Sequence, residues 1–315
     1  MFISIVVPCY NEEAVIGEMH KRLIAVLREI TPTFEIIYVD DGSKDSTVAL
    51  LRDLQNNNES VKVILLSRNF GHQYAVSAGM EHASGDAVVL IDADLQDPPE
   101  IIKEMVTKWR TGYDLVYGLR TDRAGETAFK RWTAKAFYRI YNRLSDVHIP
   151  LDTGDFRLMD RKVVDVLNGM PERDRFIRGM VSWIGSKQAA VPYSRAQRFA
   201  GTSNYKFSKM ISFAADGIFS SSLAPLRLAF WAGLSTAGLS VIGILYVLVR
   251  GVVTNTWVPG WSLLFIALLF LGGGQLMFLG VIGEYIGRVY REGKRRPLYI
   301  VSELLGFERE KEEGE

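Results

Sequence analysis

The residues best suited to chemistry form a short acidic segment, 92–96 (Asp-Ala-Asp-Leu-Gln), directly after an apolar run. In an extended backbone alternate side chains share one face, so we expect Asp92, Asp94 and Gln96 to present oxygen atoms to one point. Mg²⁺ and Mn²⁺ prefer such ligands and commonly complete their shell with water and substrate phosphates. Two acids at a strand end are more often a turn or a helix cap, but the position after a fourth predicted strand favours a metal-diphosphate site.

A second polar cluster follows the second predicted strand and contains the neighbouring acids Asp40 and Asp41. Open parallel sheets bind ligands at the carboxyl ends of their strands, where these acids would lie beside residues 8–12. Because carboxylates hold ribose hydroxyls or a base N–H, we assign Asp40 and Asp41 to a nucleotide. The nearby Asp45 and Ser46 are instead expected to cap the next helix.

These two clusters need a scaffold that brings strand ends together, and the first part of the chain predicts one. Short runs rich in Val and Ile alternate with amphipathic segments of helical period, which indicates β-α-β crossovers in a mostly parallel α/β sheet. Strands are expected at 2–8, 35–39, 61–66, 87–91 and 115–118, and helices at 13–28, 46–54 and 75–83.

Length, charge and cysteine content narrow the class of protein. The 315 residues, 48% of them hydrophobic, suffice for one large domain with an appendage or for two modest domains. The net charge of +1 argues against a nucleic-acid partner, which would require a strong basic excess. The single cysteine, Cys9, excludes an intramolecular disulfide and is expected to be a buried strand thiol. The short apolar start lacks the features of a signal peptide.

The composition changes beyond Pro225, where two uncharged apolar runs occupy residues 228–249 and 262–283. At about 1.5 Å per residue each is long enough to cross a hydrocarbon layer of roughly 30 Å, so they predict a membrane hairpin; a buried soluble hairpin is the alternative. Lys and Arg lie mainly outside the hairpin, which predicts a cytoplasmic catalytic domain and cytoplasmic termini.

The chain is therefore expected to have four parts. They are a catalytic domain (1–205), juxtamembrane amphipathic helices (206–225), two transmembrane helices (226–288) and a cytoplasmic tail (289–315).

Residues 127–144 predict a basic amphipathic helix. Arg131, Lys135, Arg139 and Arg143 recur every four residues, opposite an apolar stripe. In a protein with a membrane hairpin this pattern indicates contact with a bilayer surface; an ordinary solvated face over a core-packed stripe is the alternative.

Five motifs together resemble glycosyltransferase family 2 enzymes of the GT-A fold. The motifs occupy residues 7–12, 39–43, 68–71, 92–99 and 283–288, and the likeness covers nearly the whole chain. It is greatest to the polyprenyl-phosphate glycosyltransferases, which include bactoprenol glucosyltransferases, dolichol-phosphate mannose synthase and an aminoarabinose transferase.

The resemblance implies a reaction, its partners and its residues. A sugar, first of all glucose from UDP-glucose, would pass with inversion to undecaprenyl or another polyprenyl phosphate, with Mg²⁺ or Mn²⁺ as cofactor; GDP-mannose or another UDP-sugar is the alternative donor. The enzyme would be a homo-oligomer, a tetramer, in a bacterial plasma membrane. The implied residues are Pro8, Tyr10, Glu12, Asp41 and Asp92 for the nucleotide, Asp94 and Gln96 for metal, Arg120, Arg131, Arg198 and Lys206 for phosphates, and Asp155 for the acceptor. Relatives often have the motif Arg-x-x-Gly-x-Ser-Lys. In this chain residues 198–204 match it except at the last position, which is Asn, and the nearest lysine, Lys206, stands two positions later.

The chemistry of the implied acceptor constrains the role of Asp155. A phosphate monoester has its second pKa near 6, so most of it is already dianionic and nucleophilic at neutral pH. Asp155 therefore either accepts a residual proton or positions the acceptor, and we favour positioning.

Two rival functions are considered. One is a processive polysaccharide synthase, which needs many spans and a Gln-x-x-Arg-Trp motif that this chain lacks. The other is a sugar-nucleotide sensor without turnover.

Overall fold

The computed structural model describes residues 1–122, 153–194, 224–254 and 260–307. The chain forms two compact units. Among the described residues, the first contains 1–122, 153–194 and 296–307, and the second contains 224–254 and 260–295.

The first unit is built on one mixed sheet with the strand order β7-β5-β6-β4-β1-β2-β3-β8. Four neighbouring pairs are parallel, and the pairs that involve β6 or β8 are antiparallel. The strands are β1 (Ile3–Cys9), β2 (Phe34–Asp40), β3 (Val61–Leu66), β4 (Ala87–Leu90), β5 (Leu115–Asp122), β6 (Thr153–Asp160), β7 (Gln188–Ser194) and β8 (Val301–Leu305).

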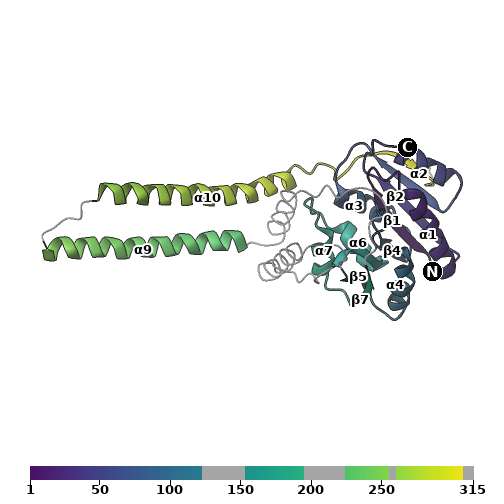
Figure 1. The fold of residues 1–315 in the computed structure, drawn as a ribbon, viewed down its shortest axis with the longest axis horizontal. Helices are drawn as coiled ribbons and strands as arrows, with labels where there is room; N and C mark the ends of the chain where they lie inside the picture. The colour runs from purple at the N-terminus through teal and green to yellow at the C-terminus, as the bar shows by residue number, and fades with distance from the viewer. Residues whose placement is uncertain (123–152, 195–223, 255–259, 308–315) are drawn as a thin grey trace, which may run out of the picture. The chain divides into compact units, whose positions relative to one another are not determined.

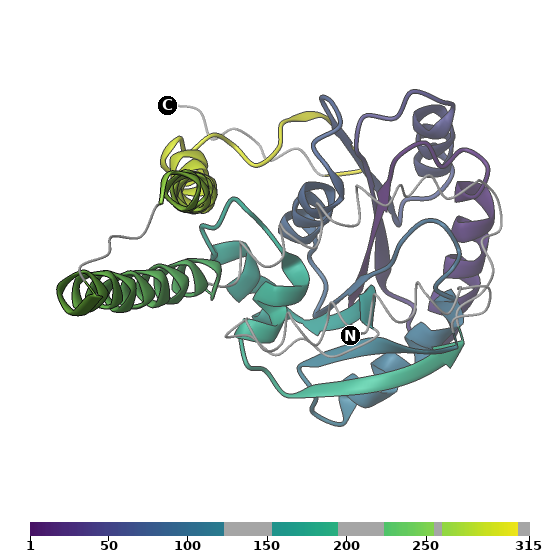
Figure 2. The same cartoon turned by 60° about the vertical axis from the view of Figure 1, so that its left-hand side comes forward.

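Helices cover both faces of this sheet (Figures 1 and 2). Alternate residues of each strand point to opposite faces, so β1 sends Ile3, Ile5 and Val7 into one core layer and Val6 into the other. The first layer contains α1 (Ile16–Ile30), α2 (Thr47–Asn56) and α4 (Ile102–Arg110), which follows the short 3-10 turn η1 (Pro99–Ile101). The second contains α3 (His72–His82), α6 (Arg161–Gly169) and α7 (Ile177–Trp183).

The parallel half of the sheet confirms the predicted α/β fold, with boundaries that differ by a few residues. Local sequence patterns predict no strand at the positions of β6, β7 or β8. The largest difference concerns β8, because residues expected in a C-terminal tail pair antiparallel with β3 and belong to the first unit. A strand of five residues beside a charged tail carries too weak a period to be recognised.

The topology brings the candidate residues to one edge of the sheet. The ends of β1 and β2 are in register, with Cys9 opposite Asp40, so the loops that follow them are neighbours. Strand β6 runs antiparallel between β4 and β5, which places Arg157 opposite Leu90 and Thr153 opposite Leu119. The amino end of β6 therefore lies beside the carboxyl ends of β4 and β5.

The second unit consists of two long helices, α9 (Ala224–Thr254) and α10 (Trp261–Gly293), which lie side by side (Figure 1). Many of their apolar side chains are exposed, such as those of Leu228, Phe270 and Leu276. Among the described residues one stretch, Pro225–Gly243, meets the length and hydropathy expected of a membrane span, with a mean hydropathy of 1.3 over 19 residues. A two-span hairpin is therefore kept as a proposal.

Candidate functional site

A pocket of about 530 Å³ opens beside the ends of β2 and β3. Its wall includes Tyr10, whose side chain is exposed as expected of an aromatic wall. The other lining residues come from the ends of β2 and β3, the loops that follow these two strands, the first turn of α2, and β8: Asp40, Gly42, Ser43, Lys44, Val48, Leu65, Leu66, Ser67, Arg68, Asn69 and Ser302.

Asp40 combines a structural role with a free acceptor. Its Oδ2 accepts backbone N–H groups of Gly42 and Ser43, both at 3.0 Å, which fixes the turn after β2. Gly42 has φ +72°, and a Cβ there would lie 2.6 Å from the carbonyl carbon of Arg68, so the turn requires glycine. The Oδ1 atom of Asp40 is buried without a hydrogen-bond partner in the described part of the chain, which suits a ligand N–H or O–H.

Asp41 holds a loop. Its two carboxylate oxygens accept the backbone N–H groups of Phe70 at 2.7 Å and Gly71 at 2.9 Å. Burial raises the pKa of Asp41, against the opposing effect of these two hydrogen bonds. A direct contact of Asp41 with a nucleotide stays a prediction.

Pro8 and Glu12, which are also predicted to bind the nucleotide, are not among the residues that line the pocket. Pro8 is buried within β1, and the backbone N–H of Glu12 donates to Thr47 Oγ1 at 2.8 Å. The structural role of Asp45 is confirmed, because its carboxylate accepts the N–H of Thr47 at 3.0 Å and that of Glu13 at 3.2 Å.

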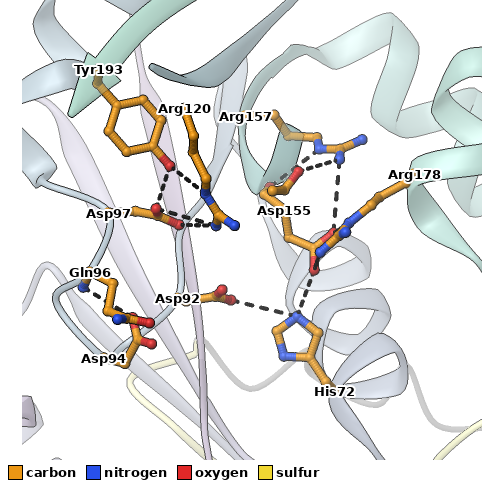
Figure 3. Close-up of polar contacts among 11 residues, drawn as sticks. His72, Asp92, Asp94, Gln96, Asp97, Arg120, Asp155, Arg157, Arg178 and Tyr193 are labelled. Carbon is orange, nitrogen blue, oxygen red and sulfur yellow. Dashed lines mark hydrogen bonds and ion pairs between the residues drawn. The ribbon is translucent and has the colours of Figure 1, made fainter. Parts of the chain in front are cut away.

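The segment 92–96 is a turn, and the expectation of an extended backbone is wrong. Strand β4 ends at Leu90, and Leu95 has φ 58°, in the left-handed region that a bulky residue seldom adopts. Burial of Leu95 in the core compensates this strain. As a result Asp94 and Gln96 lie together, whereas Asp92 points toward His72 (Figure 3).

Asp94 and Gln96 suit a cation that is shared with a substrate. Asp94 Oδ1 accepts the backbone N–H of Gln96 at 3.1 Å, which keeps both side chains on one turn. In the described ranges, no three His, Cys, Asp or Glu side chains converge into a metal cage. Mg²⁺ is commonly held by one or two protein oxygens together with phosphates and water, so this pair fits a metal that arrives with a diphosphate.

Asp155, on β6, is the centre of a buried charge network (Figure 3). It is 5% exposed and forms a bidentate pair with Arg178 of α7, in which Nε donates to Oδ1 at 2.7 Å and Nη2 to Oδ2 at 3.0 Å. His72, the first residue of α3, places Nε2 3.3 Å from Asp155 Oδ2 and 3.6 Å from Asp92 Oδ1. The buried Arg157 lies 3.8 Å from Asp155 Oδ1. His72 therefore bridges two carboxylates, one within β6 and one in the segment that follows β4.

The charges of this network determine its protonation. Burial opposes ionisation of Asp155, but the charges of Arg178 and His72 hold its pKa well below the usual range. Burial likewise opposes the imidazolium of His72, yet Asp155 and Asp92 raise its pKa to about 9. Burial raises the pKa of Asp92 to about 6 and lowers that of Arg157 to about 10. At neutral pH Asp155 is thus an ionised carboxylate with little affinity for a proton.

Arg120 belongs to a second network beside the first. Its Nη2 lies 3.2 Å from Asp97 Oδ2, its Nε donates to the Tyr193 hydroxyl at 3.1 Å, and that hydroxyl donates to Asp97. A Cβ at Gly154 would lie 2.4 Å from Arg120 Nη2, so the guanidinium packs against the bare backbone of β6. Arg120, on β5, is thereby held against Gly154, the residue that precedes Asp155 on the neighbouring strand β6.

Comparison with known proteins identifies the family. The sequence model described as Glycosyl transferase family 2 matches residues 4–167. An uncharacterized glycosyltransferase of Bacillus subtilis, YkcC, is 50% identical over 97% of this chain and 94% of its own length. The chain belongs to glycosyl transferase family 2. A bactoprenol glucosyl transferase of Shigella phage SfV is 42% identical over 96% of this chain and 98% of its own length.

A solved glucosyl-3-phosphoglycerate synthase of Mycobacterium tuberculosis, in complex with Mn²⁺, UDP and phosphoglyceric acid, is also similar. It is 24% identical, covers 69% of this chain and 76% of its own, and has a TM-score of 0.47. Family membership and the mostly parallel mixed sheet together confirm the expected GT-A-like fold and a glycosyltransferase activity.

Several predicted residues of this family 2 chain lie outside the described residues. They are Arg131 and the rest of its basic stripe, Arg198, Lys206, and the juxtamembrane segment that follows Lys206. Their assignment to phosphates or to a bilayer stays a prediction.

The structure adds residues that sequence reasoning missed, namely His72, Asp97, Arg157, Arg178 and Tyr193. His72 directly follows the motif at 68–71 and Asp97 lies within the motif at 92–99, so their positions in the sequence could have identified them as site residues. Arg157, Arg178 and Tyr193 lie in segments whose approach to the site depends on the placement of β6, α7 and β7.

We expect Gly154→Ala to displace Arg120. The new methyl group would overlap the guanidinium and force it away from Asp97 and Tyr193, at a cost of about 1–3 kcal/mol. Sugar transfer should fall about tenfold or more while the enzyme stays folded, as measured by initial rates and thermal unfolding. Gly169→Ala is the matched control, because a Cβ at Gly169 meets nothing within 4 Å. Equal rates for both variants would contradict this account of Arg120.

A second prediction concerns the pair of Asp155 and Arg178. Arg178→Gln should lower the free energy of unfolding by about 3–5 kcal/mol, because it leaves a buried carboxylate poorly compensated. Asp155→Asn in the same chain should recover part of that loss, which chemical denaturation of the four variants of the cycle would measure. Lys162→Gln, which removes a surface pair with Asp114, should leave the free energy of unfolding nearly unchanged, because an exposed pair contributes little. Strictly additive effects of the two substitutions would refute the coupling.

Proposed function

We propose that this family 2 enzyme transfers a sugar from a nucleotide donor to a polyprenyl phosphate at a membrane surface, with inversion at the anomeric carbon. The observation that carries the proposal is the 42% identity, over 96% of the chain, to a bactoprenol glucosyl transferase. We take UDP-glucose as the first donor, with GDP-mannose or another UDP-sugar as the alternatives, and the cytoplasmic leaflet of a bacterial plasma membrane as the location.

The donor fits the pocket beside β2 and β3. Its acceptor atom Asp40 Oδ1 suits a base N–H or a ribose hydroxyl, and Lys44 and Arg68 supply positive charge for an anionic ligand. The diphosphate would extend toward Asp94 and Gln96, the residues that would hold Mg²⁺ or Mn²⁺. The cation would offset negative charge on the leaving diphosphate.

The acceptor fits the network around Asp155. The anionic phosphate of a polyprenyl phosphate needs cationic partners, and Arg178, Arg157 and His72 supply them around one carboxylate. Asp155 keeps these cations in place and limits their net charge, so the acceptor oxygen is oriented without a strong base. Arg120, held by Asp97 and Tyr193, would stabilise the charge that develops during the displacement.

The membrane association rests on α9 and α10. Their exposed apolar side chains would be costly in water, and the stretch Pro225–Gly243 has the length and hydropathy of a span. We propose that both helices cross the bilayer, that both termini are cytoplasmic, and that glycines of the second helix support assembly into a homo-oligomer, a tetramer.

A donor panel tests the proposal directly. The purified full chain would be incubated with undecaprenyl phosphate, Mg²⁺ or Mn²⁺, and UDP-glucose, other UDP-sugars or GDP-mannose in turn. Mass spectrometry of the lipid should show one hexose added for the native donor. Absence of any glycosylated lipid across the panel would overturn the proposal.

Asp94→Asn should remove most turnover, because the cation loses the carboxylate of the Asp94 and Gln96 pair while the fold is retained. We expect a fall of about 100-fold or more in kcat, equivalent to roughly 2.7 kcal/mol of transition-state stabilisation. EDTA should abolish activity of the unchanged enzyme, and Asp165→Asn, at an exposed surface acid, should have no effect. Full activity of the unchanged enzyme in EDTA would argue against a metal-dependent reaction.

The pH profile of Asp155→Asn separates the two roles of this residue. The pKa of Asp155 is held well below its ordinary value, so the carboxylate is ionised above that low pKa and gains a proton only as the pH falls through it. If Asp155 positions the acceptor, raising the pH above about 7, where the phosphate is fully dianionic, should not restore the variant. Recovery of the rate at high pH would instead identify Asp155 as a proton acceptor.

A further inference from the structure

The C-terminal strand β8 contributes to the wall of the donor pocket. Ser302 is exposed and lines this pocket together with Tyr10, Asp40 and Arg68. This residue lies more than 230 positions after the other lining residues in the chain. The segment that follows the second long helix therefore returns to the nucleotide side of the sheet.

Ser302 occupies an irregular position in the pairing of β8 with β3. Leu65 pairs with Glu303 and Leu66 with Val301, so two steps along β8 match one step along β3. Ser302 is the unpaired extra residue, as in a β-bulge. Bulges often lie next to active sites, where they re-aim a side chain.

The hydroxyl of Ser302 is oriented by its own hydrogen bond. Its Oγ donates to the carbonyl oxygen of Leu65 at 2.9 Å, so the hydroxyl proton is already used in a hydrogen bond within the protein. The lone pairs of Oγ remain available to accept an N–H or O–H from a ligand. Asp40 Oδ1, buried without a partner in the described residues, offers a second acceptor to the same pocket.

Anchors on both sides hold the bulge in place. Arg52 forms a bidentate pair with Glu303, with Nη1 2.9 Å from Oε1. Before the strand, the N–H of Ser67 donates to the carbonyl of Ile300 at 2.9 Å, and the hydroxyl of Tyr299 donates to Glu81. Ser302 is therefore positioned by contacts with α2, α3 and β3, elements of the catalytic unit itself.

We propose that Ser302 is a donor-binding residue that accepts a hydrogen bond from the nucleoside part of a nucleoside diphosphate. The inference rests on the proposed donor pocket and deepens it. It makes the chain after the two long helices part of the specificity of the enzyme for its nucleotide.

Binding of nucleoside diphosphates to the full-length protein in detergent tests this role without the lipid acceptor. Isothermal titration calorimetry with UDP and GDP would compare the unchanged chain with Ser302→Ala and Ser302→Trp. Loss of one hydrogen bond in Ser302→Ala should weaken binding about two- to tenfold. The indole of Ser302→Trp should fill the pocket and weaken binding by at least about tenfold.

Leu304→Trp is the matched control, because Leu304 is exposed on the same strand and is not a lining residue of the pocket. It should bind the nucleotide within about twofold of the unchanged chain. Thermal unfolding would check that the strand stays in place, and the small Ser302→Ala change keeps the test valid if the bulky variant unfolds.

The outcomes separate this inference from the function on which it rests. Unchanged nucleotide binding by both Ser302 variants, with normal product formation, would overturn the role of Ser302 and leave the glycosyl transfer intact. Equal weakening by Leu304→Trp and Ser302→Trp, with no effect of Ser302→Ala, would also overturn it, because displacement of the strand would explain the loss. Failure of the unchanged protein to bind either nucleotide would overturn the donor pocket and this inference together.

Discussion

The charge of one buried carboxylate, that of Asp155, must be compensated by neighbouring cations, and this requirement determines how the candidate site is arranged. Asp155 loses most of its hydration, and an ionised carboxylate in that position is tolerated only with well-placed cations and hydrogen bonds. Arg178 supplies a bidentate partner and His72 and Arg157 supply further positive charge. Each of the three comes from a different element, so the pairing fixes α7, α3 and β6 relative to one another.

The first turn of α3 joins the two halves of the site. Asp41 fixes its start through the N–H groups of Phe70 and Gly71. The next residues then reach the other side, where Gln73 Oε1 accepts the N–H of Ile177 at 3.0 Å and the hydroxyl of Tyr74 donates to the carbonyl of Arg173 at 3.1 Å. A ligand that contacts the loop at 68–71 therefore touches the same rigid element that carries His72 to Asp155.

Sequence reasoning succeeded where chemistry and local period agreed. The parallel strands, the acids at their ends and the two long apolar helices all follow from local patterns. It failed where a long-range contact decides the outcome. The left-handed Leu95 depends on its burial against residues distant in sequence, and the partners of Asp155 depend on an antiparallel strand inserted between two parallel ones. No local pattern reports either fact.

The pairing of β3 with β8 also sets an order in which the protein can be completed. A chain under synthesis exposes β3 as an open sheet edge until residue 305 has been made, and unpaired edges invite association with other chains. Both long apolar helices precede β8 and must leave the ribosome first. The catalytic unit therefore finishes folding only after both apolar helices have emerged, and the pocket beside β2 and β3 is complete only once β8 has been made.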